Sequence, residues 1–354
     1  MKILYVAIKY DRGNPARGLS FEHQNFYLTL RKHHDVIYFP FDVVLKDKGR
    51  KAMNKALVEM AGQTRPDLCF FSFIDDEIEV ETIQTITARG LLTLGWFSDD
   101  HWRFDNYSRY YAPALTWVVT TDADAVQKYA GLGLKNVILA HWAANPDVFR
   151  PSPRAKNIEV SFIGSWNKGR QDIIQELRKY GLSVLVKGSG WPAGRITQAE
   201  LVSIIGRSKI HLGLNPPSAN LNYRSFFRLF LKRLSFEESF WRIKPDFWHI
   251  FGNVREWRRK KIPQIKARTY EVPACATMLI THETGVPASD FVIGKEVITY
   301  KAPADLASKI KYFLEHAAER EQIAQAGYLR VRRDHTYEKR FRDIFDAIGI
   351  GNKT

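Results

Sequence analysis

Apolar runs and helical repeats alternate along the first part of the chain. Short apolar runs such as Ile3–Ile8 are typical of buried parallel strands. Between them lie segments with the 3.6-residue spacing of amphipathic helices, such as Ser20–Lys32, where Ser20 is placed to cap the first turn. Strands that alternate with helices predict a parallel sheet covered on both faces. The predicted strands are Ile3–Ile8, Val36–Phe39, Leu68–Phe73, Leu91–Phe97, Val118–Thr121 and Val137–Leu139.

A proline-rich stretch at Asn145–Pro153 interrupts this pattern and is typical of a linker. The alternation then restarts, with predicted strands at Ile158–Ile163, Ser183–Val186, Ile210–Leu214 and Met278–Thr281. The predicted fold class is therefore α/β, with Rossmann-like domains at 1–150 and 151–335, and with 336–354 as a helix that crosses back to the first domain. Ligands of open α/β sheets bind at the carboxyl ends of the strands, so we expect two domains facing across a cleft.

The composition adds a strong positive charge to this picture. The 354 residues include 53 Lys and Arg against 38 Asp and Glu, and the net charge of +15 favours a polyanionic or phosphorylated partner. The two cysteines, Cys69 and Cys275, are too few for a disulfide framework or a structural zinc site, and both lie in apolar runs. The N-terminus is predicted to be a strand rather than a signal peptide, and no segment is apolar enough to span a membrane. These features predict a cytoplasmic protein.

Glycine-containing turns follow two of the predicted strands in the second half. Gly164 and Ser165 form the first turn, and Arg170 lies at the start of the next predicted helix. Backbone N–H groups at such a turn can bind phosphate, and an arginine adds positive charge. Gly188 lies in a second turn of this kind. Both turns are equally compatible with tight connections in which glycine serves only the backbone.

Charged side chains occupy two further positions next to predicted strands. Arg268 and Glu271 are three residues apart on a predicted helix and share one of its faces. They are candidate site residues, and the alternative is that they form only a surface ion pair. Asp99 and Asp100 follow the strand Leu91–Phe97. A carboxylate at a strand tip is placed to act as a general base, and the alternative is a helix cap with solvated charges. Asp99 is the preferred base and Asp100 the second choice.

Six short motifs along the chain together resemble one known family. They are GLSFE at 18–22, WFSDD at 96–100, WAANP at 142–146, KARTYEVPAC at 266–275, GKEV at 294–297 and HTYEKR at 335–340. In this order they resemble the group-1-type glycosyltransferases related to spore maturation protein. The resemblance covers most of the chain except about 220–262. It implies the GT-B fold and sugar transfer from a nucleotide-diphosphate sugar, with a UDP-sugar favoured.

A more distant likeness implies roles for individual residues. Four segments resemble short motifs of the DNA β-glucosyltransferases of T-even phages, which also have the GT-B fold: Ser20–Glu22, Phe97–Asp99, Gly164–Arg170 and Arg268–Glu271. The likeness implies that Asp99 is the base, that Glu22 approaches the sugar, and that Glu271 binds the ribose hydroxyls. It also implies that Arg170 and Arg268 hold the diphosphate, and we group Lys266 with these donor-binding residues.

The chain departs from the family pattern at two places. Many retaining GT-B enzymes have a glutamate eight positions before the one that matches Glu271, and here that position is Pro263. This departure favours an inverting mechanism with an aspartate base. Glycine is usual near Ala276–Thr277 and is absent, which predicts a different turn there. GT-B enzymes do not depend on an acidic metal-binding motif, so we expect no metal site and no metal requirement for folding.

Residues 223–261 stand apart in composition. They include 11 Lys and Arg, 4 Asp and Glu and 11 aromatic residues, a net charge of +7. The spacing predicts a helix over 226–241 with opposed apolar and basic faces. Such a segment suits an anionic membrane surface, a nucleic acid, or burial against the core or a second subunit. The residues assigned to the acceptor or membrane surface are Phe227, Arg228, Phe230, Lys232 and Arg233.

The predicted function is the transfer of a sugar to a hydroxyl of a cell-surface or lipid-linked glycan, at the inner face of a membrane and without a tightly bound cofactor. One alternative is a glycosyltransferase that modifies DNA. Another is a non-catalytic protein of this fold that binds nucleic acid or membrane. The joint presence of Glu22, Asp99, Arg268 and Glu271 argues against the last, because a pure binder has no use for a base. The donor sugar, the acceptor and the oligomeric state stay open.

Overall fold

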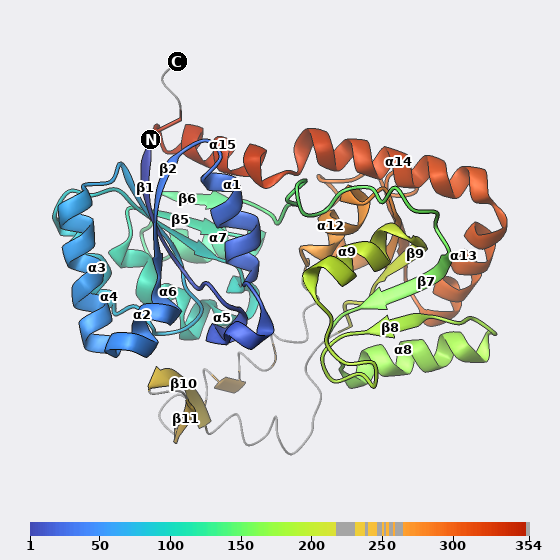
Figure 1. Ribbon diagram of the computed structural model, residues 1–354, viewed down its shortest axis with the longest axis horizontal. Coiled ribbons are helices and arrows are strands. Elements are labelled where there is room, and N and C mark those ends of the chain that lie inside the picture. Colours follow the sequence, from blue (N-terminus) through green and yellow to red (C-terminus); the bar gives the residue numbers. More distant parts are fainter. Residues whose placement is uncertain are drawn as a thin grey trace. The chain divides into compact units, whose positions relative to one another are not determined.

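The computed structural model describes residues 1–216, 231–237, 240–245, 250, 253–254, 258 and 265–351 (Figure 1). The chain divides into two units. The first unit comprises Met1–His141, Leu221–Lys260 and Arg340–Thr354, and the second comprises Trp142–Asn220 and Lys261–Lys339. The division thus falls between residues 141 and 142, a few residues before the proline-rich stretch at which we expected it.

A six-stranded parallel sheet forms the centre of the first unit. The strand order is β2-β1-β3-β4-β5-β6, so the order reverses between β1 and β3. All six strands predicted from the apolar runs are present, and the signal is clearest for the inner strands, which are buried on both faces. They are β1 (Lys2–Ala7), β2 (Asp35–Pro40), β3 (Leu68–Ser72), β4 (Thr93–Phe97), β5 (Trp117–Thr120) and β6 (Val137–Leu139).

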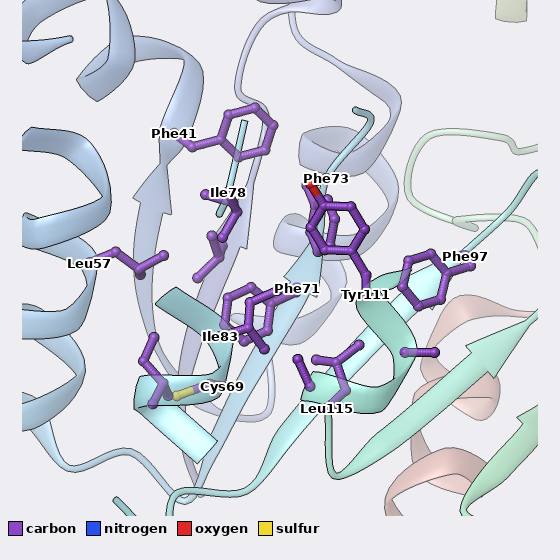
Figure 2. Packing of buried hydrophobic residues seen from close by; sticks show 14 of the residues in the cluster. Phe41, Leu57, Cys69, Phe71, Phe73, Ile78, Ile83, Phe97, Tyr111 and Leu115 are labelled. Atoms are coloured by element: carbon purple, nitrogen blue, oxygen red, sulfur yellow. The ribbon is translucent and has the colours of Figure 1, made fainter. Parts of the chain in front are cut away.

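Helices cover both faces of this sheet, and each face has its own core. On one face, α3 (Arg50–Thr64) and α4 (Val80–Ala88) pack Leu57 and Ile83 against Cys69 and Phe71 of β3 (Figure 2). The other helical segments are η1 (Asp11–Gly13), η2 (Pro15–Arg17), the π-helix η3 (His23–Tyr27), α1 (Leu28–Leu30), α2 (Phe41–Lys48), α5 (Asp100–Arg103), η4 (Phe104–Asn106), α6 (Ser108–Tyr111), η5 (Ala112–Ala114) and α7 (Ala123–Ala130).

The second face of the sheet is closed by the end of the chain. Helix α15 (Tyr337–Ala347) carries Phe341, whose ring lies edge-on to Phe26 at 5.3 Å and to Phe70 at 5.8 Å between centroids. Phe70 and Phe71 are neighbours on β3, so their side chains point to opposite faces. The C-terminal helix is therefore part of the aromatic core of the first unit.

A five-stranded parallel sheet forms the second unit, with the order β13-β12-β9-β7-β8. Helices α8 and α13 supply core residues to one face, and α9 and α12 to the other. The strands are β7 (Ile158–Ile163), β8 (Leu185–Lys187), β9 (Ser208–Gly213), β12 (Met278–His282) and β13 (Ile298–Tyr300). The helices are α8 (Lys168–Lys179), α9 (Gln198–Gly206), α12 (Arg268–Ala274), η6 (Glu283–Gly285), α13 (Pro303–Glu315) and α14 (Ala317–Asp334).

The HTY motif at 335–337 lies within the second unit and is hydrogen-bonded to the first residues of that unit. Ala144 N–H donates to the carbonyl of His335 at 2.9 Å, and Tyr337 N–H donates to the carbonyl of Ala144 at 3.1 Å. His335 in turn contacts the carbonyl of Asp290 through Nε2 at 2.8 Å. The linker and the segment that leads into α15 are therefore hydrogen-bonded to each other.

The basic aromatic segment contradicts one prediction. The expected helix over 226–241 is wrong where the structure describes it, because β10 (Leu231–Glu237) and β11 (Phe240–Pro245) form a two-stranded antiparallel sheet. Lys232 and Arg233 thus lie on a strand, while Phe227, Arg228 and Phe230 lie outside the described residues. Trp241 and Ile243 alternate with Arg242 and Lys244, and this period of two suits a strand. The helix prediction was based only on the spacing of apolar residues in 226–241, and it did not consider this period of two.

The cysteines confirm a further expectation. Cys69 and Cys275 are free and buried. Within the described ranges, every helix is too short or too polar to cross a bilayer.

Candidate active site

The second sheet offers a binding edge where its strand order reverses. The carboxyl ends of β7 and β9 lie side by side there, while the chain leaves them in opposite directions, toward β8 and toward β12. Such a switch point forms a crevice at the carboxyl edge of an open α/β sheet. The turn at Gly164 and Ser165 follows β7, and Leu214 and Asn215 follow β9.

Arg170 spans this switch point. Its Nε donates to the carbonyl of Leu214 at 3.0 Å and its Nη1 to the carbonyl of Ser165 at 2.6 Å. Asn167 caps α8 by accepting the N–H of Arg170 at 2.9 Å, which fixes the residue on the first turn of the helix. The guanidinium lies 5.4 Å from the centroid of the Phe162 ring. The sequence singled out this arginine for its helix position, and the structure shows that it links two strand ends.

No carboxylate in the described part of the chain neutralises the charge of Arg170. Among the residues that the structure describes, no Asp or Glu lies within ion-pair distance of it. Burial and the nearby charge of Arg268 lower the pKa of Arg170. The two guanidinium groups therefore repel each other, and an anion bound near both would relieve this repulsion.

Close packing between the two turns requires glycine at position 188. Gly188 has φ +133°, and a Cβ on it would lie 2.2 Å from the carbonyl oxygen of Gly164. The same oxygen accepts the indole N–H of Trp191 at 2.9 Å. Gly188 could serve phosphate binding or a tight backbone connection, and this contact directly supports the tight connection. Ser165 is exposed at the surface of the first turn.

Arg268 and Glu271 form an ion pair on α12 with 2.8 Å between Nη1 and Oε2. The side chain of Glu271 is only 5% exposed, so the pair is not the surface contact considered above. Burial raises the pKa of Glu271, and the charge of Arg268 opposes this effect. Lys266, the other basic residue of the motif at 266–275, lies exposed just before α12.

His211 lies beneath this site and was not found from the sequence. Ser208 Oγ donates to the carbonyl of Ile204 at 2.6 Å, so the hydroxyl of Ser161 donates to Ser208 and accepts from His211 Nδ1, both at 2.7 Å. This chain places the imidazole proton on Nδ1. Burial, together with the charge of Arg268, holds the pKa of His211 far below its usual value, so the ring is neutral. The contacts join β7 to β9, and a lone histidine in an apolar strand gives no sequence signal for them.

Asp99 and Asp100 differ sharply in the first unit. Asp100 is fully buried and accepts the hydroxyl of Tyr129 at 2.8 Å. Burial raises the pKa of Asp100 to about 6, against the hydrogen bonds it accepts. Asp99 is partly exposed at the carboxyl end of β4. Of the two aspartates, Asp99 is therefore the one within reach of a ligand in this conformation.

Glu22 lies in the same unit, at the start of the π-helix η3. Burial raises the pKa of Glu22 to about 7, and the negative charges of Asp11 and Asp99 act in the same direction. Hydrogen bonding by Ser20 and by its own backbone opposes this shift. π-Helical turns are rare and frequently occur at functional sites. A carboxyl group with this pKa is partly protonated at neutral pH and can donate a hydrogen bond.

Arg103 is a second residue that the sequence did not reveal. It lies on α5, one turn after Asp99, and pairs with Asp75 at 2.5 Å in the loop that follows β3. Its guanidinium also stacks on Tyr107 at 4.0 Å. Arg103 thus ties the ends of β3 and β4 together around Asp99. In the described parts of the chain, no group of three His, Cys, Asp or Glu is arranged to hold a metal ion.

Comparisons with known proteins agree with this architecture. Residues 249–346, which include α12 and the HTY motif, match a family model described as glycosyl transferase-like. No curated protein sequence matches the chain.

Solved glycosyltransferase structures match the chain over nearly its whole length. HepE from Anabaena, solved in complex with UDP-glucose, is 10% identical, with a TM-score of 0.60 over 98% of this chain and 99% of that one. A glycosyltransferase from Rickettsia africae is 13% identical, with a TM-score of 0.59 over 98% of each chain. Sucrose-phosphate synthase from Thermosynechococcus elongatus is 10% identical, with a TM-score of 0.59 over 98% of this chain and 99% of that one. The protein therefore has the GT-B fold of glycosyltransferases, as its motifs predicted.

Proposed function

We propose that the protein transfers a sugar from a UDP-sugar to a hydroxyl acceptor. The observation that carries this proposal is the position of Arg170, which bridges the switch point of the second sheet beside Arg268 and Glu271. Support comes from HepE, which has the same fold and was solved with UDP and with UDP-glucose. The matched segment of the glycosyl transferase-like family contains α12, which carries two of these residues.

The donor binds the second unit through its diphosphate and its ribose. Arg170 and Arg268 make charge-assisted hydrogen bonds to the diphosphate, supplemented by the backbone N–H of Ser165 in the turn after β7. Glu271 accepts hydrogen bonds from the ribose hydroxyls. The positive charge that holds the ground state also stabilises the diphosphate as it leaves, when its negative charge increases.

The transfer step is a single displacement with inversion. Asp99 accepts the proton of the acceptor hydroxyl while the acceptor oxygen bonds to the anomeric carbon of the sugar. The bond between that carbon and the diphosphate oxygen breaks, and its electron pair leaves with UDP. The protonated fraction of Glu22, whose pKa is about 7, donates a hydrogen bond to a sugar hydroxyl. No metal ion is assigned to this step.

The acceptor is a glycan at an anionic membrane surface. This part of the proposal rests on the composition of residues 223–261, whose net charge of +7 and 11 aromatic residues suit such a surface. Liposome sedimentation tests it. Binding that requires anionic lipid, weakens with salt and is lost in Phe227→Glu/Phe230→Glu supports a membrane acceptor. Binding to duplex DNA with a steep salt dependence, and none to liposomes, would identify a DNA-modifying enzyme instead.

The activity is tested by nucleotide stabilisation and by donor hydrolysis. UDP at 100 times its Kd should add about 2.7 kcal/mol to the free energy of unfolding. Slow release of UDP from UDP-glucose without an acceptor, lost in Arg170→Gln, would support the enzyme. If no nucleoside diphosphate stabilises the protein and no UDP-sugar is hydrolysed, the proposed function is wrong.

A further inference from the structure

The Arg268–Glu271 pair has an unusual geometry for a buried ion pair. Nη1 of Arg268 lies 2.8 Å from Oε2 of Glu271, yet this buried nitrogen makes no hydrogen bond to any described residue. The contact is thus held by charge alone, without a directed N–H···O bond. A buried donor without a hydrogen bond costs free energy. An oxygen in a better position would therefore accept a hydrogen bond from Nη1 of Arg268 and remove this cost.

The ion pair stabilises the charge of Glu271 more than it stabilises the charge of Arg268. The carboxylate is 5% exposed, against 26% for the arginine side chain, and its ionised form is stabilised chiefly by this one cation. Withdrawing Arg268 would leave a buried charge without a partner, which is strongly unfavourable. Arg170, the neighbouring cation, is held by two carbonyls and has no such carboxylate among the described residues.

We infer that the Arg268–Glu271 ion pair is a placeholder that the donor replaces at both ends, so that Glu271 makes the site select a nucleoside diphosphate over inorganic diphosphate. This inference rests on the proposed function. A ligand that has both phosphate and ribose gives Arg268 a phosphate oxygen and Glu271 two hydroxyl donors. Inorganic diphosphate has phosphate oxygens but no hydroxyl donors. It must therefore either compete with Glu271 for Arg268 or leave Glu271 unpaired.

Calorimetric titration of Glu271→Gln with UDP and with inorganic diphosphate tests the exchange. Glutamine keeps the size of the side chain and removes the competing charge. Inorganic diphosphate should then bind about tenfold more tightly, the worth of one charge-assisted contact. UDP should gain nothing, because it loses the carboxylate that accepts its ribose hydroxyls. The ratio of the two affinities should therefore fall by about tenfold or more.

A matched control separates this effect from net charge. Glu176 pairs with Lys179 at the same three-residue spacing on an exposed face of α8. Glu176→Gln removes the same charge from the same unit and should leave both affinities unchanged. An equal gain for inorganic diphosphate in the Glu176 and Glu271 variants would overturn the inference.

The failure of this inference differs from the failure of the proposed function. Tight UDP binding to the unaltered protein, with no gain for inorganic diphosphate in Glu271→Gln, overturns the placeholder alone. Absence of UDP binding to the unaltered protein overturns the proposed function and this inference with it.

A double variant covers the case in which Glu271→Gln does not fold. Arg268→Gln/Glu271→Gln removes both charges together and leaves no buried charge unpaired. In the unaltered protein, Glu271 already neutralises the charge of Arg268, so Arg268 adds little to the binding of inorganic diphosphate. The affinity of the double variant for inorganic diphosphate should therefore lie within about threefold of that of the unaltered protein, a change as small as the loss of a weak ion pair. UDP should bind at least about tenfold more weakly. A tenfold loss for inorganic diphosphate as well would overturn the inference.

Discussion

Asp99 and Asp100 show how neighbouring residues of one type take different roles. Asp100 is buried against Tyr129, whereas Asp99 is partly exposed at the end of β4. We predict that Asp99→Asn lowers kcat by at least about 100-fold and leaves donor binding nearly unchanged, because it keeps the size of the side chain and removes the proton acceptor. Asp100→Asn should lower the melting temperature and keep most of the kcat of the folded fraction. An active Asp99→Asn with an inactive Asp100→Asn would assign the base to Asp100.

Glu22 provides a pH-dependent prediction. Its pKa is raised from 4.5 to about 7 by burial, so its contribution to stability is fully present below pH 4.5 and is lost as the pH rises through 7. Glu22→Gln, which cannot ionise, should therefore gain about 3 kcal/mol in unfolding free energy relative to the unaltered protein between pH 4.5 and 8. Chemical denaturation across this range measures the difference, with Glu176→Gln as the exposed control. A difference that does not change with pH would contradict the buried carboxyl.

Single residues were predictable from the sequence only where their place in a motif carried the information. Asp99, Arg170 and Glu271 follow strands or begin helices, and those positions can be recognised along the chain. His211 and Arg103 act through partners far away in sequence, Ser161 and Asp75. Such contacts depend on which strands are neighbours in the sheet. The local hydrophobic periodicity of the sequence does not predict this order of strands.

At the scale of elements, the turn before β12 keeps the geometry of a glycine turn without a glycine. Ala276 has φ +52°, a left-handed conformation that costs a residue with a Cβ about 1 kcal/mol. Lys156 donates to its carbonyl at 2.8 Å and holds the turn in place. The backbone at this position therefore adopts the left-handed conformation that glycine favours, although no glycine is present.

We predict that Ala276→Gly leaves stability unchanged or raises it by about 0.5 kcal/mol, because relief of the positive φ offsets the greater freedom of the unfolded chain. Ala274→Gly, two residues earlier at the end of α12, should destabilise by about 1 kcal/mol. Thermal or urea unfolding of the two variants measures both changes. Equal losses in both would show that Ala276 is not strained.

The contact between Gly188 and Gly164 gives a second prediction for an element. Gly188→Ala should lower the free energy of unfolding by about 3 kcal/mol and weaken UDP binding, because the new Cβ would lie 2.2 Å from a backbone oxygen of the other turn. Gly181→Ala is the matched control, since Gly181 also has positive φ, +78°, but has open space around its missing Cβ. Similar losses at the two positions would mean that backbone conformation, and not the contact between the turns, explains the effect.

Apolar runs were the predictable elements. All six strands of the first sheet were expected from such runs, although only the inner strands such as β3 and β4 are fully buried. The short helices α2, α5 and α6 were missed, since few turns give little periodicity. The antiparallel pair of β10 and β11 was missed because apolar residues in a short segment match a helical face and a strand about equally well.

At the scale of the whole molecule, two parallel sheets divide the proposed chemistry between them. The first unit supplies carboxyl groups, one of them with a pKa near neutrality, and the second supplies two guanidinium groups at a switch point. The fold itself was predicted from the order of motifs, while the choice of acceptor depends on residues 223–261 and on the membrane and DNA experiments described above.

The central claim is that the second unit binds the diphosphate of a UDP-sugar through Arg170. Calorimetric titration of UDP into the unaltered protein, Arg170→Gln and the control Arg178→Gln, near the end of the same helix, tests it most directly. We predict that Arg170→Gln weakens UDP binding by about 1.5–3 kcal/mol and Arg178→Gln by less than about 0.5 kcal/mol. UDP that binds equally well to all three proteins would contradict the claim.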